Sequence, residues 1–371
     1  MEYGLYNDFL VFSNTFLKDK LFPTDIHIVE RVDGPYVIKA HLLSNYQSIP
    51  VPHILNQPAT ITVNANETRQ FRGIVTRFES GEIDYLGRRE YYIELKPWLA
   101  LLALFRFNRF YYNETIPNIV RRVAIDVCKK DLSTQRLVKK YTPQDCVIQY
   151  QENCLDFIHR LLAQAGMFYT FDFAKPFELP VLKDWPAATG QKYTVNNRGA
   201  NADYLYDWVE SMSIQPQSVS IQTRADQFSN HLIYRQKKLG KDFDYKLKQH
   251  CFPHGIDGAE AAEDVLRYEV QLSKMNNAKV RFKSQLSGFS AGYSSRIFYP
   301  GNPEKEGSYM TLSVEHHAWD HSYHKAKGLT PPTGELAEET MHYHNHVTAI
   351  PNKLDYIPTR IIAPKIKNVT T

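Results

Sequence analysis

Hydrophobic residues recur at every second position along much of the first hundred residues. Ile26 and Ile28, for example, alternate with polar neighbours. Side chains two apart in a β-strand lie on the same face of a sheet, whereas a helix repeats every 3.6 residues. The pair Asp33-Gly34, typical of a tight turn, separates two alternating runs. The pattern predicts β-hairpins, and residues 1–97 are interpreted as one β module.

Composition narrows the class of protein. The chain has 371 residues, more than the roughly 250–300 at which a single hydrophobic core stops growing, so several domains are expected. Aromatic residues make up 13% of it, with 24 Tyr and 20 Phe, which favours strands over helices. The net charge of +4 is spread out without a dense Lys/Arg run, so nucleic acid is not expected as a partner.

Targeting signals are absent from the sequence pattern. Glu2 and Asp8 stand where a secretory signal would carry basic residues, so the chain is expected to be made in a cytoplasm without a signal peptide. The longest strongly apolar stretch, Trp98–Phe105, is far shorter than the about 20 residues that span a bilayer. We therefore expect a core segment there and no membrane-spanning segment. The cysteines, which have no short paired spacing, are interpreted as reduced thiols: Cys128, Cys146, Cys154 and Cys251.

The hydrophobic repeat becomes helical after the first β module. Residues 116–127 are predicted to form a helix with Thr115 as N-cap. Another helix is predicted over 155–165, with Asn153 as its cap and Gly166 as its left-handed stop. The core of this helix is predicted to consist of Leu155, Phe157, Ile158, Leu161 and Leu162.

One five-residue motif suggests catalysis. Gly288–Gly292 fits the G-x-S-x-G pattern that exposes a nucleophilic serine, here Ser290, between a strand and a helix. The residues that follow, 293–299, are aromatic and β-branched, which predicts a strand instead of the required helix. We interpret the motif as a strand turn, with a serine hydrolase using Ser290 as the less favoured alternative.

Half of the 14 histidines lie within 31 residues: His316, His317, His321, His324, His342, His344 and His346. Residues two apart in a strand are nearly 7 Å apart along the chain, so consecutive ones rarely converge on one metal ion. We therefore expect these histidines to be surface or subunit-contact residues that do not meet at a common point. No catalytic residue, metal ligand or cofactor is assigned.

Many residues at fixed spacings between Trp98 and Phe173 resemble one family. They are Thr115, Pro117, Ile119, Gln149, Tyr150, Glu152, Asp156, Phe157, Arg160, Leu161, Leu162, Gly166, Tyr169 and Phe171. This stretch resembles the N-terminal tail-hub region of VgrG, the spike protein of type VI secretion, and is similar to the late-control D proteins of contractile-tailed phages.

Polar residues within this stretch are candidates for a role beyond core packing. Gln149, Glu152, Asp156 and Arg160 are expected to share a face near the helix start, because the last three are spaced four apart. Such a cluster would orient the helix or cross a subunit boundary. Replacing Arg160 with Ala is then expected to cost little monomer stability.

The resemblance implies a mainly β fold with inserted helices (α+β) and two similar β-barrel modules of the phage tail-hub type. We expect the first module in 1–97, with 203–240 as a candidate for completing it. The second module and its helices are expected in 98–202 with 279–356. Residues 241–278 are expected to be a helical insertion, and 357–371 an exit linker towards a spike domain.

The resemblance also implies a structural function without catalysis. Three copies would form a ring that caps a hexameric inner-tube protein and carries a downstream spike domain with effector cargo. The apparatus would deliver the protein outside the cell. The alternative is the tail hub of a contractile phage or prophage.

Overall fold

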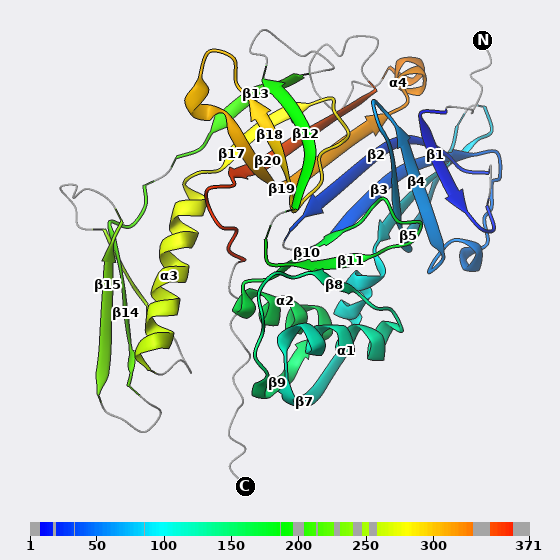
Figure 1. Ribbon diagram of the computed structural model, residues 1–371. Helices are drawn as coiled ribbons and strands as arrows, with labels where there is room; N and C mark the ends of the chain where they lie inside the picture. Colours follow the sequence, from blue (N-terminus) through cyan, green and yellow to red (C-terminus); the bar gives the residue numbers. More distant parts are fainter. Residues whose placement is uncertain are drawn as a thin grey trace.

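A continuous twelve-stranded sheet runs through two groups of six strands (Figure 1). The computed structural model describes residues 8–17, 20–32, 34–84, 86–185, 187–195, 204–212, 214–225, 231–239, 247–251, 258–328 and 342–358. The elements are mostly strands with inserted helices, which confirms the predicted fold class.

The first group is an antiparallel sheet with the order β1-β4-β5-β6-β3-β2. Its strands are β1 (Leu10–Asn14), β2 (Phe22–Arg31), β3 (Gly34–Ser44), β4 (Pro58–Asn64), β5 (Thr68–Ile83) and β6 (Arg89–Lys96). The edge strands β1 and β2 lie near each other, but in the described part of the chain no ladder joins them. The sheet is therefore open and has an apolar inner face to cover.

The second group closes on itself. Its strands are β12 (Ala187–Val195), β13 (Tyr204–Glu210), β17 (Val280–Ser284), β18 (Tyr293–Phe298), β19 (Gly307–Trp319) and β20 (Tyr343–Pro351). They pair in the ring β19-β18-β12-β13-β17-β20, and β20 returns to β19. This closed six-stranded barrel has its own core, which includes Val314 and Phe282.

One long strand, β19, belongs to both groups. Its residues 307–310 pair with β18 of the barrel, and its residues 313–319 pair with β2 of the open sheet. Strand β20 lies along β19 on the other side. The two groups are therefore joined by a ladder of backbone hydrogen bonds as well as by side chains.

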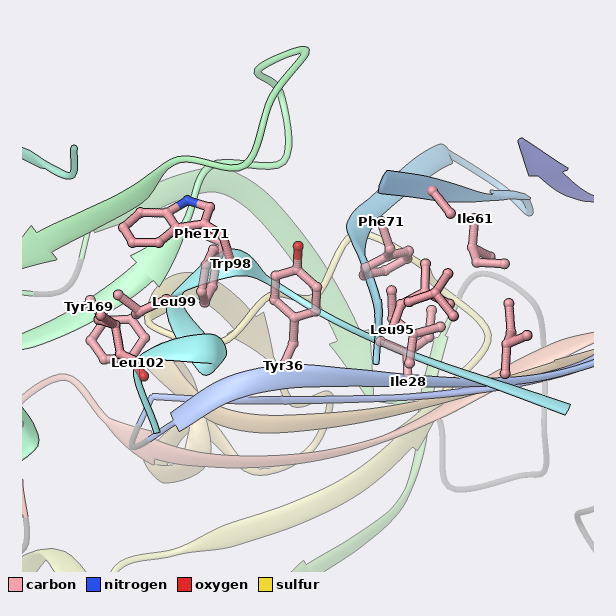
Figure 2. Close-up of a cluster of buried hydrophobic side chains, with 14 of the residues drawn as sticks. Ile28, Tyr36, Ile61, Phe71, Leu95, Trp98, Leu99, Leu102, Tyr169 and Phe171 are labelled. Atoms are coloured by element: carbon pink, nitrogen blue, oxygen red, sulfur yellow. The ribbon is translucent and has the colours of Figure 1, made fainter. Parts of the chain in front are cut away.

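The segment after the first sheet covers the inner face of that sheet. It contains η2 (Trp98–Leu104), β7 (Arg106–Glu114), α1 (Ile116–Cys128), β8 (Ser133–Arg136), β9 (Gln144–Asn153), α2 (Cys154–Ala165), β10 (Phe168–Phe171) and β11 (Pro180–Lys183). Figure 2 shows side chains of this cover, such as Trp98 and Phe171, next to Tyr36 of the sheet, with Leu95 on the other side of Tyr36; all belong to one buried cluster. We expected this segment to accompany the second module. It packs on the first because the open sheet exposes an apolar face that the closed barrel does not.

The described residues within 203–240 do not complete the first module, contrary to expectation. Strand β13 lies in the barrel. Strands β14 (Ser218–Arg224), β15 (Leu232–Lys238) and β16 (Lys248–Cys251) form a separate sheet that packs against α3 (Ala259–Asn276). This later stretch has a core of its own, in which Val219 and Ile221 of β14 pack against Val265 and Leu266 of α3. Parts of the expected insertion over 241–278 and nearly all of the expected linker over 357–371 lie outside the described residues.

The remaining elements are short. They are η1 (Val51–His53), η3 (Pro303–Lys305) and α4 (His321–Lys327). All four cysteines carry free thiols, as predicted. Within the described ranges, each helix is too short or too polar to traverse a lipid bilayer.

Candidate functional site

Helix α2 has both predicted ends. The Asn153 side chain accepts a hydrogen bond from the Asp156 backbone N–H at 2.8 Å, and Gly166 ends the helix at φ 64°. In α1, by contrast, Thr115 occupies the N-cap position without a side-chain hydrogen bond. Four of the five predicted core residues of α2 are buried: Phe157, Ile158, Leu161 and Leu162. The fifth, Leu155, is half-buried and packs against the same hydrophobic cluster.

A buried ion pair fixes α2 to β9. Arg160 Nη2 donates to Glu152 Oε1 at 2.6 Å, and its Nε donates to Oε2 at 3.1 Å. Both side chains are 6% exposed. The same Nη2 also donates to the backbone carbonyl of Ile148 at 2.9 Å. This geometry links the helix to the strand that precedes it.

The expected common face of four polar residues is only partly present. Gln149 is buried beside Glu152, and its Nε2 donates to the backbone carbonyl of Glu152 at 3.2 Å. Asp156 is exposed and bonds with Asn153. The helical spacing argument was wrong because residues 149 and 152 lie in strand β9 and the helix begins at Cys154. The burial of the Arg160–Glu152 pair instead predicts a large loss of monomer stability when Arg160 is replaced, contrary to the expectation from the sequence.

A second buried cluster joins the open sheet to the barrel. Arg69 of β5 donates from Nη2 to Glu30 Oε1 of β2 at 2.8 Å. Its Nη1 donates to the carbonyls of Ser287 and Phe289, in the loop between β17 and β18, at 3.0 and 2.7 Å. His316 of β19 bonds the same Glu30 oxygen at 2.9 Å. We call Glu30, Arg69 and His316 the joint cluster.

The charges of the joint cluster are set by one another. Burial alone would raise the pKa of Glu30, but the Arg69 charge and the His316 hydrogen bond hold that pKa below its ordinary value. Burial lowers the pKa of His316, and the nearby Arg69 charge acts in the same direction. A neutral His316 can donate from Nε2 to Glu30 while Nδ1 accepts from the Tyr343 hydroxyl at 2.6 Å. The cluster is therefore an ion pair with a neutral imidazole.

Ser290 is part of this joint. Its hydroxyl accepts a hydrogen bond from Arg69 Nη2 at 2.7 Å, and no imidazole bonds it in the described part of the chain. The surrounding residues form a turn between two strands, which confirms the local structure predicted for the G-x-S-x-G motif. Gly292 has φ 77°, and a Cβ there would overlap Thr170 of β10. The turn that contains the motif is therefore packed closely against both β5, through Arg69, and β10, through Thr170.

Lys183 of β11 contacts the same turn. Its Nζ lies 3.5 Å from the centre of the Tyr293 ring and donates to the Gly292 carbonyl at 3.4 Å. Burial lowers the pKa of Lys183 to about 7, and the Arg136 charge adds to the lowering. The cover, the open sheet and the barrel thus meet in one polar junction.

The crowded histidines are not all on the surface. His316, His324 and His344 are buried. The rings of His317 and His344 stack with centroids 4.8 Å apart, and His346 lies 5.8 Å from His317. The expectation of surface positions was wrong for His316, His324 and His344. The rings of His317, His344 and His346 come close in pairs because neighbours across the β19–β20 ladder are closer than neighbours along one strand. Among the described residues, however, no three of the seven form a group of possible metal ligands.

An exposed aromatic strand lies on the cover. Strand β7 pairs only with β9 in the described residues. Phe110 and Tyr112 are 58% and 65% exposed, and their rings are near-parallel with centroids 6.3 Å apart. Leu104, just before β7, is 78% exposed. We call Leu104, Phe110 and Tyr112 the ribbon patch.

Sequence reasoning missed Glu30 and Arg69. A signal was present: Glu30 is in phase with the buried Ile26 and Ile28, and Arg69 is in phase with the buried Phe71. A charged residue on the apolar side of an alternating strand needs a buried partner. Two such residues of opposite sign in one module suggest a pair.

The sequence is similar to a known protein family and to several curated proteins. The family model of the phage tail baseplate hub (GPD) matches residues 29–322. The type VI secretion system spike protein VgrG1a of Pseudomonas aeruginosa is 22% identical over 327 residues, which cover 82% of this chain and 50% of VgrG1a. The chain thus spans about half the length of the curated relatives that it matches.

Solved structures share the fold. The E. coli c3393 protein, described as a type VI secretion component similar to the T4 tail proteins gp27 and gp5, has a TM-score of 0.69 at 17% identity over 96% of this chain and 80% of that one. The 43 kDa tail protein of the Shewanella oneidensis prophage MuSo2 has a TM-score of 0.64 at 13% identity over 93% of this chain and 98% of that one. As the resemblance predicted, this chain belongs to the phage tail baseplate hub family.

Proposed function

We propose that this chain is the hub at the base of a type VI secretion spike, a structural protein that works as a homotrimer. The observation that carries the proposal is the pair of six-stranded units joined through β2 and β19. Three copies of such a pair would present six similar units around one axis. A ring of this kind can match a hexameric tube while it carries a threefold spike.

The ribbon patch is the proposed subunit contact. Aromatic side chains are enriched in the cores of protein interfaces. Phe110 and Tyr112 lie on a two-stranded sheet whose outer face has no covering element within the described residues. The buried Arg160–Glu152 pair fixes β9 against α2, and β9 in turn pairs with β7, which carries Phe110 and Tyr112. The pair itself would act within one subunit.

The partners follow from this role. We propose an inner-tube protein on one side of the ring, and a spike domain with effector cargo on the other. The protein would be made in the bacterial cytoplasm and leave the cell as part of the injection apparatus. Turnover of a substrate is not part of the role, and the use of Ser290 in anchoring Arg69 supports a structural function for that motif.

A tail hub of a phage or prophage is the second candidate. The family model is that of the phage tail baseplate hub, and the MuSo2 prophage tail protein shares the fold at a TM-score of 0.64. The two candidates share the hub geometry and differ in the tube that they cap. Binding to the tube protein of each system distinguishes them.

Light scattering and electron microscopy test the proposal. At high concentration the mass should approach three times the 43.1 kDa of the chain, and images with a candidate tube protein should show rings. Phe110→Ser with Tyr112→Ser should lower the trimer fraction. Tyr234→Ser, which changes a 52% exposed tyrosine on the separate sheet, is the control. A chain that stays monomeric even when fused to the spike region of a relative such as VgrG1a would contradict the hub proposal.

A further inference from the structure

Three possible metal ligands meet on the outer side of the seam between β2 and β19. His27 stands directly opposite His317 in the antiparallel pair. Glu315 is two residues before His317 and therefore lies on the same face. One ligand atom from each of these three residues lies within 4.8 Å of the others. The two strands thus place two imidazoles and one carboxylate together.

One ligand atom of the site has no partner within the described part of the protein. His27 Nε2 is a buried atom without a hydrogen-bond partner in the described structure, which leaves it available to a ligand. A neutral imidazole carries a free lone pair on one ring nitrogen, which is the atom that coordinates a metal ion.

Access and neighbouring charge also matter. His27 and His317 line a surface pocket of about 360 Å³, so an ion can reach them from solvent. His346 stands opposite Glu315 on β20 and is exposed, so it is close to the site. Lys39 of β3 stands opposite His27, and its positive charge opposes cation binding. Solvent access and His346 favour the binding of a cation, whereas Lys39 weakens it, so we expect a moderate affinity for a metal ion.

We propose that His27, Glu315 and His317 bind a divalent transition-metal ion, with Zn²⁺ as the best fit, across the seam between the two β modules. Two imidazoles and a carboxylate are a known zinc donor set, and water or a further histidine can occupy the fourth position. The rings of His27 and His317 stack with centroids 4.5 Å apart and an interplanar angle of 18°. Zn–N bonds of about 2.0–2.1 Å in the ring planes therefore require at least one of the two rings to rotate on binding. The ion would cross-link β2 to β19.

This proposal departs from the expectation that no metal is bound. That expectation rested on the spacing of histidines along one strand, whereas these ligands come from two neighbouring strands. The site is also independent of the hub proposal, because it rests on the seam within one chain. Either proposal can fail without the other.

Calorimetry with zinc chloride, after dialysis of the full chain against a chelator, tests the site. We expect one Zn²⁺ per chain, and a visible absorption band of four-coordinate cobalt when Co²⁺ is used instead. His27→Ala and His317→Ala should each weaken zinc binding by about 100-fold or more, since even residues that only support ligands contribute about 10- to 100-fold. His53→Ala, which changes an exposed histidine of η1, should leave binding unchanged.

Glu315→Gln keeps the shape of the site and guards against misfolding of the histidine variants. It should weaken zinc binding while the circular dichroism spectrum of the apo chain stays that of the wild type. His346→Ala tests whether His346 is the fourth zinc ligand. Weaker zinc binding by this variant would add His346 to the ligand set. No stoichiometric zinc binding by the wild type, or equal binding by wild type, His317→Ala and Glu315→Gln, would overturn the proposal.

Discussion

The open sheet and the closed barrel solve the same problem differently. Each has six strands and an apolar inner face, but only the barrel returns its last strand to its first. The open sheet instead shares its core with the cover, so that Ile28 and Leu95 pack in one cluster with Trp98 and Leu161. The barrel core draws on its own strands and adjoining loop, as with Phe282 and Phe289. The stability of the open sheet should therefore depend on a segment outside it.

The joint cluster offers the largest test of this comparison. Arg69→Met would leave the Glu30 carboxylate buried without its cation, which should cost about 3–5 kcal/mol of unfolding free energy. Urea unfolding should then separate into two steps, with the barrel unfolding last. Arg77→Met, which breaks an exposed pair with Glu79, should cost less than about 1 kcal/mol. Equal effects of the two changes would contradict a role for the joint.

The buried ion pair between Arg160 and Glu152 in the cover should give the next largest effect on stability. Arg160→Met would strand Glu152 in the interior, and we again expect a loss of about 3–5 kcal/mol in chemical denaturation. Asp156→Asn changes an exposed carboxylate four residues earlier on the same helix and serves as the control. A loss for Arg160→Met as small as that for the control would show that the pair is not needed to hold α2.

Hydrogen exchange can show where the cover acts. Leu161→Ala should cost about 2–5 kcal/mol, because Leu161 is fully buried in the cluster that the cover shares with the open sheet. Amide exchange should accelerate in β3 and β6, while β17 and β20 keep their protection. Val347→Ala in the barrel should give the reverse pattern. Uniform acceleration after either change would mean that the two modules unfold as one unit.

Lys183 gives the junction a pH dependence. Its folded pKa of about 7 lies below the ordinary value of 10.5, so the unfolded chain binds more protons between these limits. Stability from this group should therefore rise with pH from about 7 towards 10, with a slope of at most about 1.4 kcal/mol per pH unit. Lys183→Met should flatten that slope in urea titrations. An unchanged slope would show that Lys183 is solvated.

Helix caps give the smallest effect. Asn153→Ala removes the side-chain acceptor at the start of α2 and should cost about 0.5–2 kcal/mol in thermal unfolding. Thr115→Ala at the start of α1 removes no such hydrogen bond and should cost less. If the two substitutions lower the unfolding free energy equally, the Asn153 side-chain hydrogen bond does not stabilise α2.

Local patterns in the sequence predicted the local structure. Alternation around Ile28 predicted the strand, and the spacing from Asn153 to Gly166 predicted α2 with both ends. Pairing between distant segments could not be predicted in this way. Nothing near Tyr193 indicates that β12 lies parallel to β18, about a hundred residues later. His27 and His317 meet for the same reason, because the β2–β19 ladder joins residues that no local pattern connects.

The shared strand β19 has a consequence for how the hub bears load. A pull along β19 acts parallel to its ladder with β2, so the hydrogen bonds over residues 313–319 are loaded in shear. Bonds loaded in shear must break together, whereas bonds at the end of a peeled hairpin break one at a time. In the hub role proposed above, force entering one module would pass to the other through this stiff coupling. The seam is therefore suited to transmit a sudden push without acting as a hinge.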